Sequence, residues 1–97
     1  MSRYNIYYRK YNILARNYIS YIKVVLTDDI YHEIGKMICT SLEKIESISY
    51  TKPKATQEDC ERYWLSEGYI KISDNLYREE NKNGQNTWNL QDYSSSL

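Results

Sequence analysis

Phenylalanine is absent from this chain of 97 residues, and cysteine, glycine and proline are scarce, at two, three and one residues. Two cysteines do not build the disulfide framework that stabilises many small secreted domains, so Cys39 and Cys60 are expected to be reduced thiols. The few glycines form no glycine-rich phosphate loop. Aromatic residues make up 14% of the chain. They are twelve tyrosines and two tryptophans, so tyrosine rings must supply most of the aromatic part of the core.

Long apolar segments are also missing. No stretch reaches the roughly 18 apolar residues of a membrane span, and no signal peptide with a basic start and an apolar middle is present. We therefore expect a soluble, cytoplasmic protein that binds no membrane. The bias toward isoleucine, tyrosine, asparagine and lysine is typical of AT-rich genomes. Small chains of this kind often come from viruses, phages or mobile elements, so the expected location is the cytoplasm of a host cell.

Residues suited to catalysis or metal binding are few. His32 is the only histidine, and no Gly-x-Ser-x-Gly motif is present. On a helix His32 and Cys39 would lie about 10.5 Å apart along the axis, too far to bind one zinc ion at ~2.0–2.3 Å. The acidic pair 28–29 fits a helix cap, and the pair 79–80 would point to opposite faces of a strand. We therefore predict no catalytic residue, no metal site, no cofactor and no enzymatic activity.

The clearest pattern runs from Asp28 to Ile48. Large aliphatic residues recur there at steps of three and four, as on the buried face of an amphipathic helix, and Asp28 and Asp29 are suited to cap its start. Gly35 would cost such a helix about 1 kcal/mol relative to alanine, which a close contact between helix and sheet would explain. The pattern predicts one long helix with four buried positions: Ile34, Ile38, Leu42 and Ile45.

The segments before this helix read as strands. Arg3–Lys10 alternates in polarity, and Tyr18–Leu26 is rich in β-branched and aromatic residues with apolar side chains on both faces. With Asn12–Asn17 as a loop, they predict a β-hairpin whose second strand is central in a sheet. The connector Ser49–Lys54 is suited to add a short edge strand.

After the connector, Thr56 is suited to cap a shorter helix through the N–H of Asp59, and Gly68 to end it. Turns at Asp74–Asn75 and Asn83–Gly84 predict a three-stranded antiparallel meander. One face of this meander is predicted to carry Ile70, Ile72, Tyr77, Trp88 and Leu90.

The fold expected from these segments is α+β. It has an N-terminal β-hairpin, a long amphipathic helix, a short second helix and the C-terminal meander, in the order β-β-α-α-β-β-β. Residues 1–92 are expected to form one compact domain, and residues 93–97 a flexible C-terminal tail.

Charge is distributed unevenly along the chain. Residues 1–27 contain five cations and no acid, interleaved with tyrosines. Tyrosine and arginine are enriched at interface hot spots, so this segment is predicted to bind a partner. An ordinary sheet with solvated cations has the same composition, and so does a surface that stacks bases and pairs with phosphates. The residues predicted to contact the partner are Tyr7, Arg9, Lys10, Tyr11 and Arg16.

These features favour a small non-enzymatic binding protein. Its expected partner is a host protein or a protein–nucleic-acid complex, with inhibition of a host defence or nucleic-acid-processing enzyme as one mode of action. A homodimer and direct binding to nucleic acid are left open. High salt would weaken phosphate binding steeply, which distinguishes the nucleic-acid alternative.

A second interpretation comes from residues 56–90. A helix followed by a glycine and a hairpin resembles the second half of a winged helix, which implies nucleic-acid binding. Residues 56–67 hold four acids against one arginine, however, and a phosphate backbone requires cations. In this alternative the contacts would come from Arg62, Lys71, Arg78 and Lys82.

Overall fold

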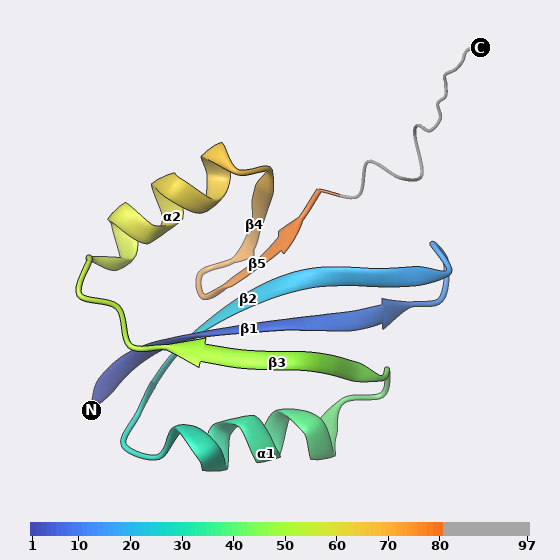
Figure 1. The fold of residues 1–97 in the computed structure, drawn as a ribbon, viewed down its shortest axis with the longest axis horizontal. Coiled ribbons are helices and arrows are strands. Elements are labelled where there is room, and N and C mark those ends of the chain that lie inside the picture. Colours follow the sequence, from blue (N-terminus) through green and yellow to red (C-terminus); the bar gives the residue numbers. More distant parts are fainter. Residues whose placement is uncertain (81–97) are drawn as a thin grey trace.

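The computed structural model describes residues 1–80, which form a five-stranded antiparallel sheet and two helices (Figure 1). The strand order in the sheet is β3-β1-β2-β5-β4. The predicted α+β class is confirmed, but a strand lies between the two helices, so the element order is β-β-α-β-α-β-β. The elements are β1 (Ser2–Asn12), β2 (Asn17–Thr27), α1 (Ile30–Thr40), β3 (Ile45–Thr51), α2 (Gln57–Ser66), β4 (Tyr69–Ser73) and β5 (Leu76–Glu79).

Several expectations fall outside the described residues. The Asn83–Gly84 turn, the third meander strand with Trp88 and Leu90, the cation Lys82 and the tail 93–97 all follow residue 80. These remain predictions. No helix within residues 1–80 is long and apolar enough to cross a membrane.

The predicted N-terminal hairpin is confirmed. β1 and β2 pair in register from Ser2 opposite Thr27 to Asn12 opposite Asn17, and β2 is the middle strand of the five. In the turn 13–16 the side-chain oxygen of Asn12 accepts a hydrogen bond from the backbone N–H of Ala15 at 2.9 Å. Long β-branched and aromatic strands therefore form the centre of the sheet, as their composition indicates.

Each face of the sheet carries one helix and one core. Because side chains alternate along a strand, Ile6 and Tyr8 of β1 face one side and Ile22 of β2, which pairs with Tyr7, faces the other. Ile6 and Tyr8 pack with Ile30 and Met37 of α1. The second core lies beneath α2 and contains Ile22, Val24, Trp64 and Tyr77.

The core beneath α2 is built around two aromatic rings. The Trp64 and Tyr77 rings meet edge to face with centroids 4.9 Å apart, and the Tyr77 hydroxyl donates to a Glu61 oxygen at 2.5 Å. Burial, and then this bond to Glu61, raises the pKa of Tyr77 to about 12. The same bond, with Lys71 nearby, lowers the pKa of Glu61. The buried phenol therefore has the partner that its hydroxyl requires.

The prediction of one long helix over residues 28–48 is wrong. The helix ends at Thr40 with Ser41 as its cap, and residues 45–51 form the edge strand β3. A bulge lies between the pairs Tyr7–Ser49 and Arg9–Glu46, where Ser47 has φ of 56°. The extra residue brings Ile45 and Ile48 to the same core, although three-residue spacing in a regular strand would put them on opposite faces. Because of the bulge, apolar residues three positions apart face the same core in a strand, a spacing that is otherwise typical of a helix.

This correction changes which side chains are buried. Ile34 and Ile45 pack against the α1 core, but Ile38 is 53% exposed and Leu42 is 97% exposed. Leu42 falls in the loop after α1 instead of on the helix face that contacts the sheet. The predicted burial of Ile38 and Leu42 is therefore wrong.

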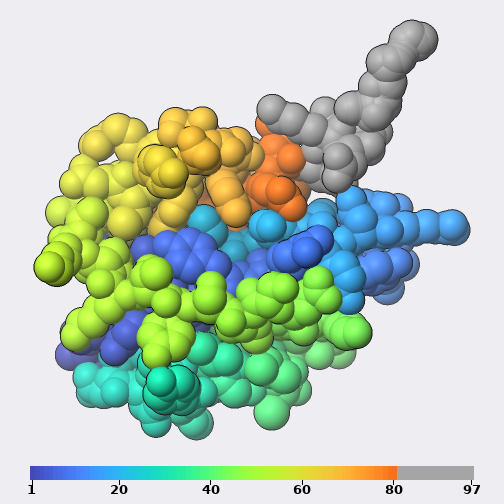
Figure 2. Space-filling view, in the orientation of Figure 1, coloured from blue at the N-terminus to red at the C-terminus, as the bar shows by residue number. Residues whose placement is uncertain are grey.

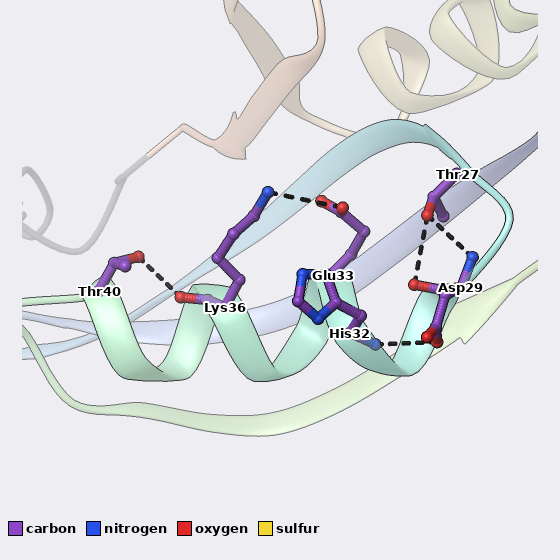
Figure 3. A network of polar contacts seen from close by, with 6 residues as sticks. All are labelled: Thr27, Asp29, His32, Glu33, Lys36 and Thr40. Atoms are coloured by element: carbon purple, nitrogen blue, oxygen red, sulfur yellow. Dashed lines mark hydrogen bonds and ion pairs between the residues drawn. The ribbon is translucent and has the colours of Figure 1, made fainter.

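The predicted start of α1 is confirmed at Asp29. Its carboxylate accepts a hydrogen bond from the backbone N–H of His32 at 3.1 Å, and its own N–H donates to the Thr27 hydroxyl (Figure 3). Glu33 in the first turn pairs with Lys36 at 3.6 Å. Acidic groups at this end stabilise the helix through its free N–H groups and its dipole.

The predicted ends of α2 are confirmed as well. The Thr56 hydroxyl accepts from the N–H of Asp59 at 3.1 Å, and Gly68, just after the cap residue Glu67, has φ of +99°. That left-handed conformation favours glycine at the end of a helix.

The β4–β5 hairpin has the predicted turn but a different register. Asp74–Asn75 forms the turn and Ser73 pairs with Leu76, but Lys71 instead of Ile72 lies opposite Tyr77. Ile72 is the extra residue of a bulge and is 42% exposed, and Ile70 faces away from Tyr77. The predicted common face of Ile70, Ile72 and Tyr77 is therefore wrong.

Gly35 does not lie against the sheet, so the close contact expected there is wrong. A Cβ built at Gly35 would have no heavy atom within 4 Å outside its own helix. Replacing Gly35 with alanine should raise the free energy of unfolding by about 0.5–1 kcal/mol, because alanine loses less backbone entropy in a helix. Denaturant unfolding followed by circular dichroism measures the change.

Gly68→Ala is the matched control for this prediction. Its positive φ strains any residue with a Cβ, so this variant should be less stable than the parent. If Gly35→Ala is no more stable than the parent, the open surroundings described for Gly35 are incorrect.

Candidate functional site

The residues predicted to bind a partner do not lie on a single surface. Tyr7, Arg9 and Tyr11 alternate with Lys10 along β1, so Lys10 lies on the α1 side of the sheet and the other three lie on the α2 side. Arg16 is exposed in the turn 13–16 with φ of 57°. The structure therefore divides this set between two faces and the end of the hairpin.

On the α2 side, the predicted residues have partners within the fold. Arg9 pairs with Glu46 of β3 at 3.5 Å, and its guanidinium carbon lies 5.5 Å from the centre of the Tyr18 ring. The Tyr7 hydroxyl is 3.3 Å from that of Thr51, and its ring packs on the core beneath α2. Folding thus accounts for Tyr7 and Arg9 in the absence of a partner.

On the α1 side, Lys10 also makes intramolecular contacts. Its ammonium lies 3.8 Å from the Glu43 carboxylate and 4.9 Å from the centre of the Tyr21 ring, which stacks on Tyr8 at 5.4 Å. The ion pair is partly exposed, so its contribution to stability is small. Lys10 links β1 to the loop between α1 and β3.

The residues of the nucleic-acid alternative are also separated. Arg62 pairs with Asp59 of its own helix at 2.9 Å, and Lys71 pairs with Glu61 at 3.2 Å. Arg78 lies on the opposite side of the sheet from Lys71, because their strand partners alternate. Each of the two cations near α2 thus already faces an acid.

A hollow lies where the end of α1 meets the β1–β2 hairpin. Two adjoining pockets of about 320 Å³ share Lys10 and Glu43 as lining residues. One lies beside the end of α1 and includes Tyr8, Lys23 and Leu42. The other is lined by the end of β1 and by Ile13 and Leu14 of the turn 13–16. We call the two together the hairpin-end groove, defined by Tyr8, Lys10, Ile13, Leu14, Lys23, Leu42 and Glu43.

The rim of the hairpin-end groove is aliphatic and exposed. Leu42 is 97% exposed, Leu14 96% and Ile13 71%. The end of the hairpin extends beyond both helices, on the side where α1 connects to β3 (Figures 1 and 2). Two segments that are distant in the sequence therefore present large apolar side chains at one end of the molecule.

Inside the pocket beside α1, two polar groups have no partner within residues 1–80. Lys23 is half-buried and makes no ion pair, and the hydroxyl of Tyr8, a residue only 7% exposed, makes no hydrogen bond. Burial, followed by the neighbouring phenol of Tyr21, raises the pKa of Tyr8 to about 12. The Tyr8 hydroxyl thus stays protonated at neutral pH and is able to donate a hydrogen bond.

Sequence reasoning missed most of this groove. Of the predicted set, Lys10 and Tyr11 line it, and Arg16 lies in the adjacent turn. The sequence predicts Leu42 in the core and gives no site prediction for Leu14 or Lys23. One signal was available, because two large aliphatic residues at 13–14 are unusual in a turn that is normally polar.

The groups considered for catalysis and metal binding remain apart. Within residues 1–80 no three His, Cys, Asp or Glu side chains gather closely enough to hold a metal ion. His32 and Cys39 are exposed on α1. Cys60 packs against the core beneath α2, where its sulfur contacts the Asn5 amide. Comparison of the chain with protein-family models, curated proteins and solved structures gave no significant match.

Proposed function

We propose that this protein is a non-enzymatic binding domain that docks a segment of another protein in the hairpin-end groove. One observation carries the proposal. Three large aliphatic side chains from the turn 13–16 and the loop after α1 are exposed around a hollow, and two of them, Leu14 and Leu42, are almost fully exposed. Apolar groups gathered in this way mark interaction sites, and covering each side chain contributes about 1.5–3 kcal/mol.

The proposal refines the partner-binding set predicted from the sequence. It keeps Lys10, Tyr11 and Arg16 at or beside the groove and places Tyr7 and Arg9 outside it. A viral, phage or mobile-element origin and the inhibition of a host enzyme are part of the proposal and rest on composition alone.

Nucleic acid is a less suitable occupant of this groove. Proteins that bind single strands stack bases on open aromatic faces. Here Tyr8 and Tyr21 stack on each other, and Lys10 lies over the Tyr21 ring. The exposed rim is formed by leucine and isoleucine, which give bases no ring to stack on.

Selection from a displayed library of random peptides on the full chain tests the proposal. We expect the selected peptides to lose at least about 30-fold in affinity for a Leu14→Asp, Leu42→Asp double variant, the effect of losing one hot spot of 2 kcal/mol. Because both side chains are almost fully exposed, the variant should keep its circular dichroism spectrum and melting temperature.

Leu26→Asp is the matched control, since Leu26 is 66% exposed on β2 but does not line the groove. It should bind the selected peptides like the parent protein. The proposal fails if no peptide is enriched, or if the enriched peptides bind the double variant as tightly as they bind the parent.

A further inference from the structure

The pocket beside the end of α1 has an excess positive charge. The charged residues that line it are Lys10, Lys23 and Glu43. Glu43 is engaged by Lys10 at 3.8 Å, which leaves the half-buried Lys23 without a carboxylate within residues 1–80. A cation held partly away from water favours an anion beside it, because Coulomb attraction strengthens as the local dielectric constant falls.

The end of α1 does not supply that anion. Its last carbonyl groups carry only a partial negative charge, equivalent to about half an elementary charge for the whole helix. Some of these carbonyls are already bonded, since the Met37 oxygen accepts from the Ser41 N–H and the Lys36 oxygen accepts from the Thr40 hydroxyl. The end of α1 therefore does not neutralise Lys23.

Tyr8 provides a second, independent feature that suits an anion. Its side chain is more than nine-tenths buried, lines the same pocket and has no hydrogen-bond partner within residues 1–80. The hydroxyl oxygen itself is not among the buried atoms that lack a partner, so it is open to the pocket, where an anionic acceptor would form a stronger bond than a neutral one. An ammonium and a phenol O–H therefore line one hollow.

We propose that this pocket binds the carboxylate of an aspartate or glutamate in the docked segment, with the Lys23 ammonium and the Tyr8 hydroxyl as donors. Leu42 at the rim then covers an apolar side chain next to that acid. The inference rests on the proposed function and names the chemistry of the partner, an acidic peptide segment with bulky apolar neighbours.

A single carboxylate suits this pocket better than a phosphate group. Glu43 lines the pocket too, and its negative charge repels a dianion more strongly than a monoanion. The aliphatic rim also matches an apolar peptide side chain, whereas a nucleotide would require an open aromatic face.

Two blocked peptides provide the test. Ac-Leu-Asp-Leu-NH2 and Ac-Leu-Asn-Leu-NH2 have the same shape, and only the first carries a charge. Both are titrated into the isotope-labelled full chain and followed through the backbone amide signals. We expect the aspartate peptide to shift the amides of Lys23 and of residues 40–43 and to bind about tenfold more tightly than the asparagine peptide, a difference of 1.4 kcal/mol.

Variants then identify the groups that recognise the charge. Lys23→Gln should reduce the affinity for the aspartate peptide to that of the asparagine peptide, and Tyr8→Phe should reduce it in part while preserving the ring. Lys44→Gln is the matched control, because Lys44 is exposed in the loop between α1 and β3 and does not line the pocket. It should leave the preference for aspartate unchanged.

Each alternative result overturns the inference. Equal binding of the two peptides would show that the pocket does not recognise the carboxylate. It would not contradict apolar docking in the groove, so the library selection tests the proposed function separately. Absence of binding at this pocket, or a preference for aspartate that survives Lys23→Gln, also refutes it. Inorganic phosphate or a single-stranded oligothymidine that shifts the same amides and displaces the aspartate peptide would assign the pocket to phosphate.

Discussion

Replacing Trp64 with alanine should lower the free energy of unfolding by about 3–5 kcal/mol, the usual cost of removing a large buried aromatic side chain. Trp64 is 5% exposed and meets the fully buried Tyr77 edge to face above Ile22 and Val24. Alanine would leave a cavity between α2 and the sheet. Because small domains are stable by only about 5–15 kcal/mol, the loss should be large enough to shift the unfolding midpoint strongly.

Tyr63→Ala is the control for this experiment. Tyr63 precedes Trp64 on the same helix but is exposed, so its removal should change stability by no more than about 0.5 kcal/mol. Unfolding followed by far-ultraviolet circular dichroism compares the two without depending on tryptophan fluorescence. If both variants lose the same stability, α2 does not present Trp64 to the sheet.

The second large effect concerns the core beneath α1. Ile6→Ala should lower the free energy of unfolding by about 2–5 kcal/mol, because Ile6 is fully buried against Tyr8, Ile30 and Met37. Chemical denaturation of the full chain gives the value directly.

Ile38→Ala tests whether Ile38 belongs to this core. A helix continuing to Ile48 would bury Ile38, whereas in the structure the residue is more than half exposed on α1. Its truncation should therefore cost less than about 1 kcal/mol. A cost for Ile38→Ala that matches the cost for Ile6→Ala would support the longer helix and contradict the observed end at Thr40.

Local patterns predicted the hairpin, both helix starts and the Asp74–Asn75 turn because each depends on a few neighbouring residues. Strand alternation identified β1, and a side-chain oxygen identified each cap. In β3 and β4 the prediction of which side chains share a face failed at a bulge. The extra residues near Ser47 and at Ile72 reset which side chains share a face, and neither residue is a glycine that would mark the irregularity.

The hairpin-end groove was less predictable than the fold because it is assembled from distant segments. Its rim requires both the turn 13–16 and the loop that begins where α1 ends. With α1 extended to Ile48, Leu42 would be a core residue and no groove would be expected. A single misplaced helix end therefore conceals the candidate site from sequence reasoning.

The central position of the β1–β2 hairpin has a consequence for folding during synthesis. This hairpin precedes α1, β3, α2, β4 and β5 in the chain, so it is made before them, and its pairing needs only short-range loop closure, which is fast. β3 then adds to the free side of β1, while β4 and β5 add as a hairpin to the free side of β2. Within residues 1–80 each later strand joins an edge already present, so this part of the sheet grows outward without opening to admit a strand.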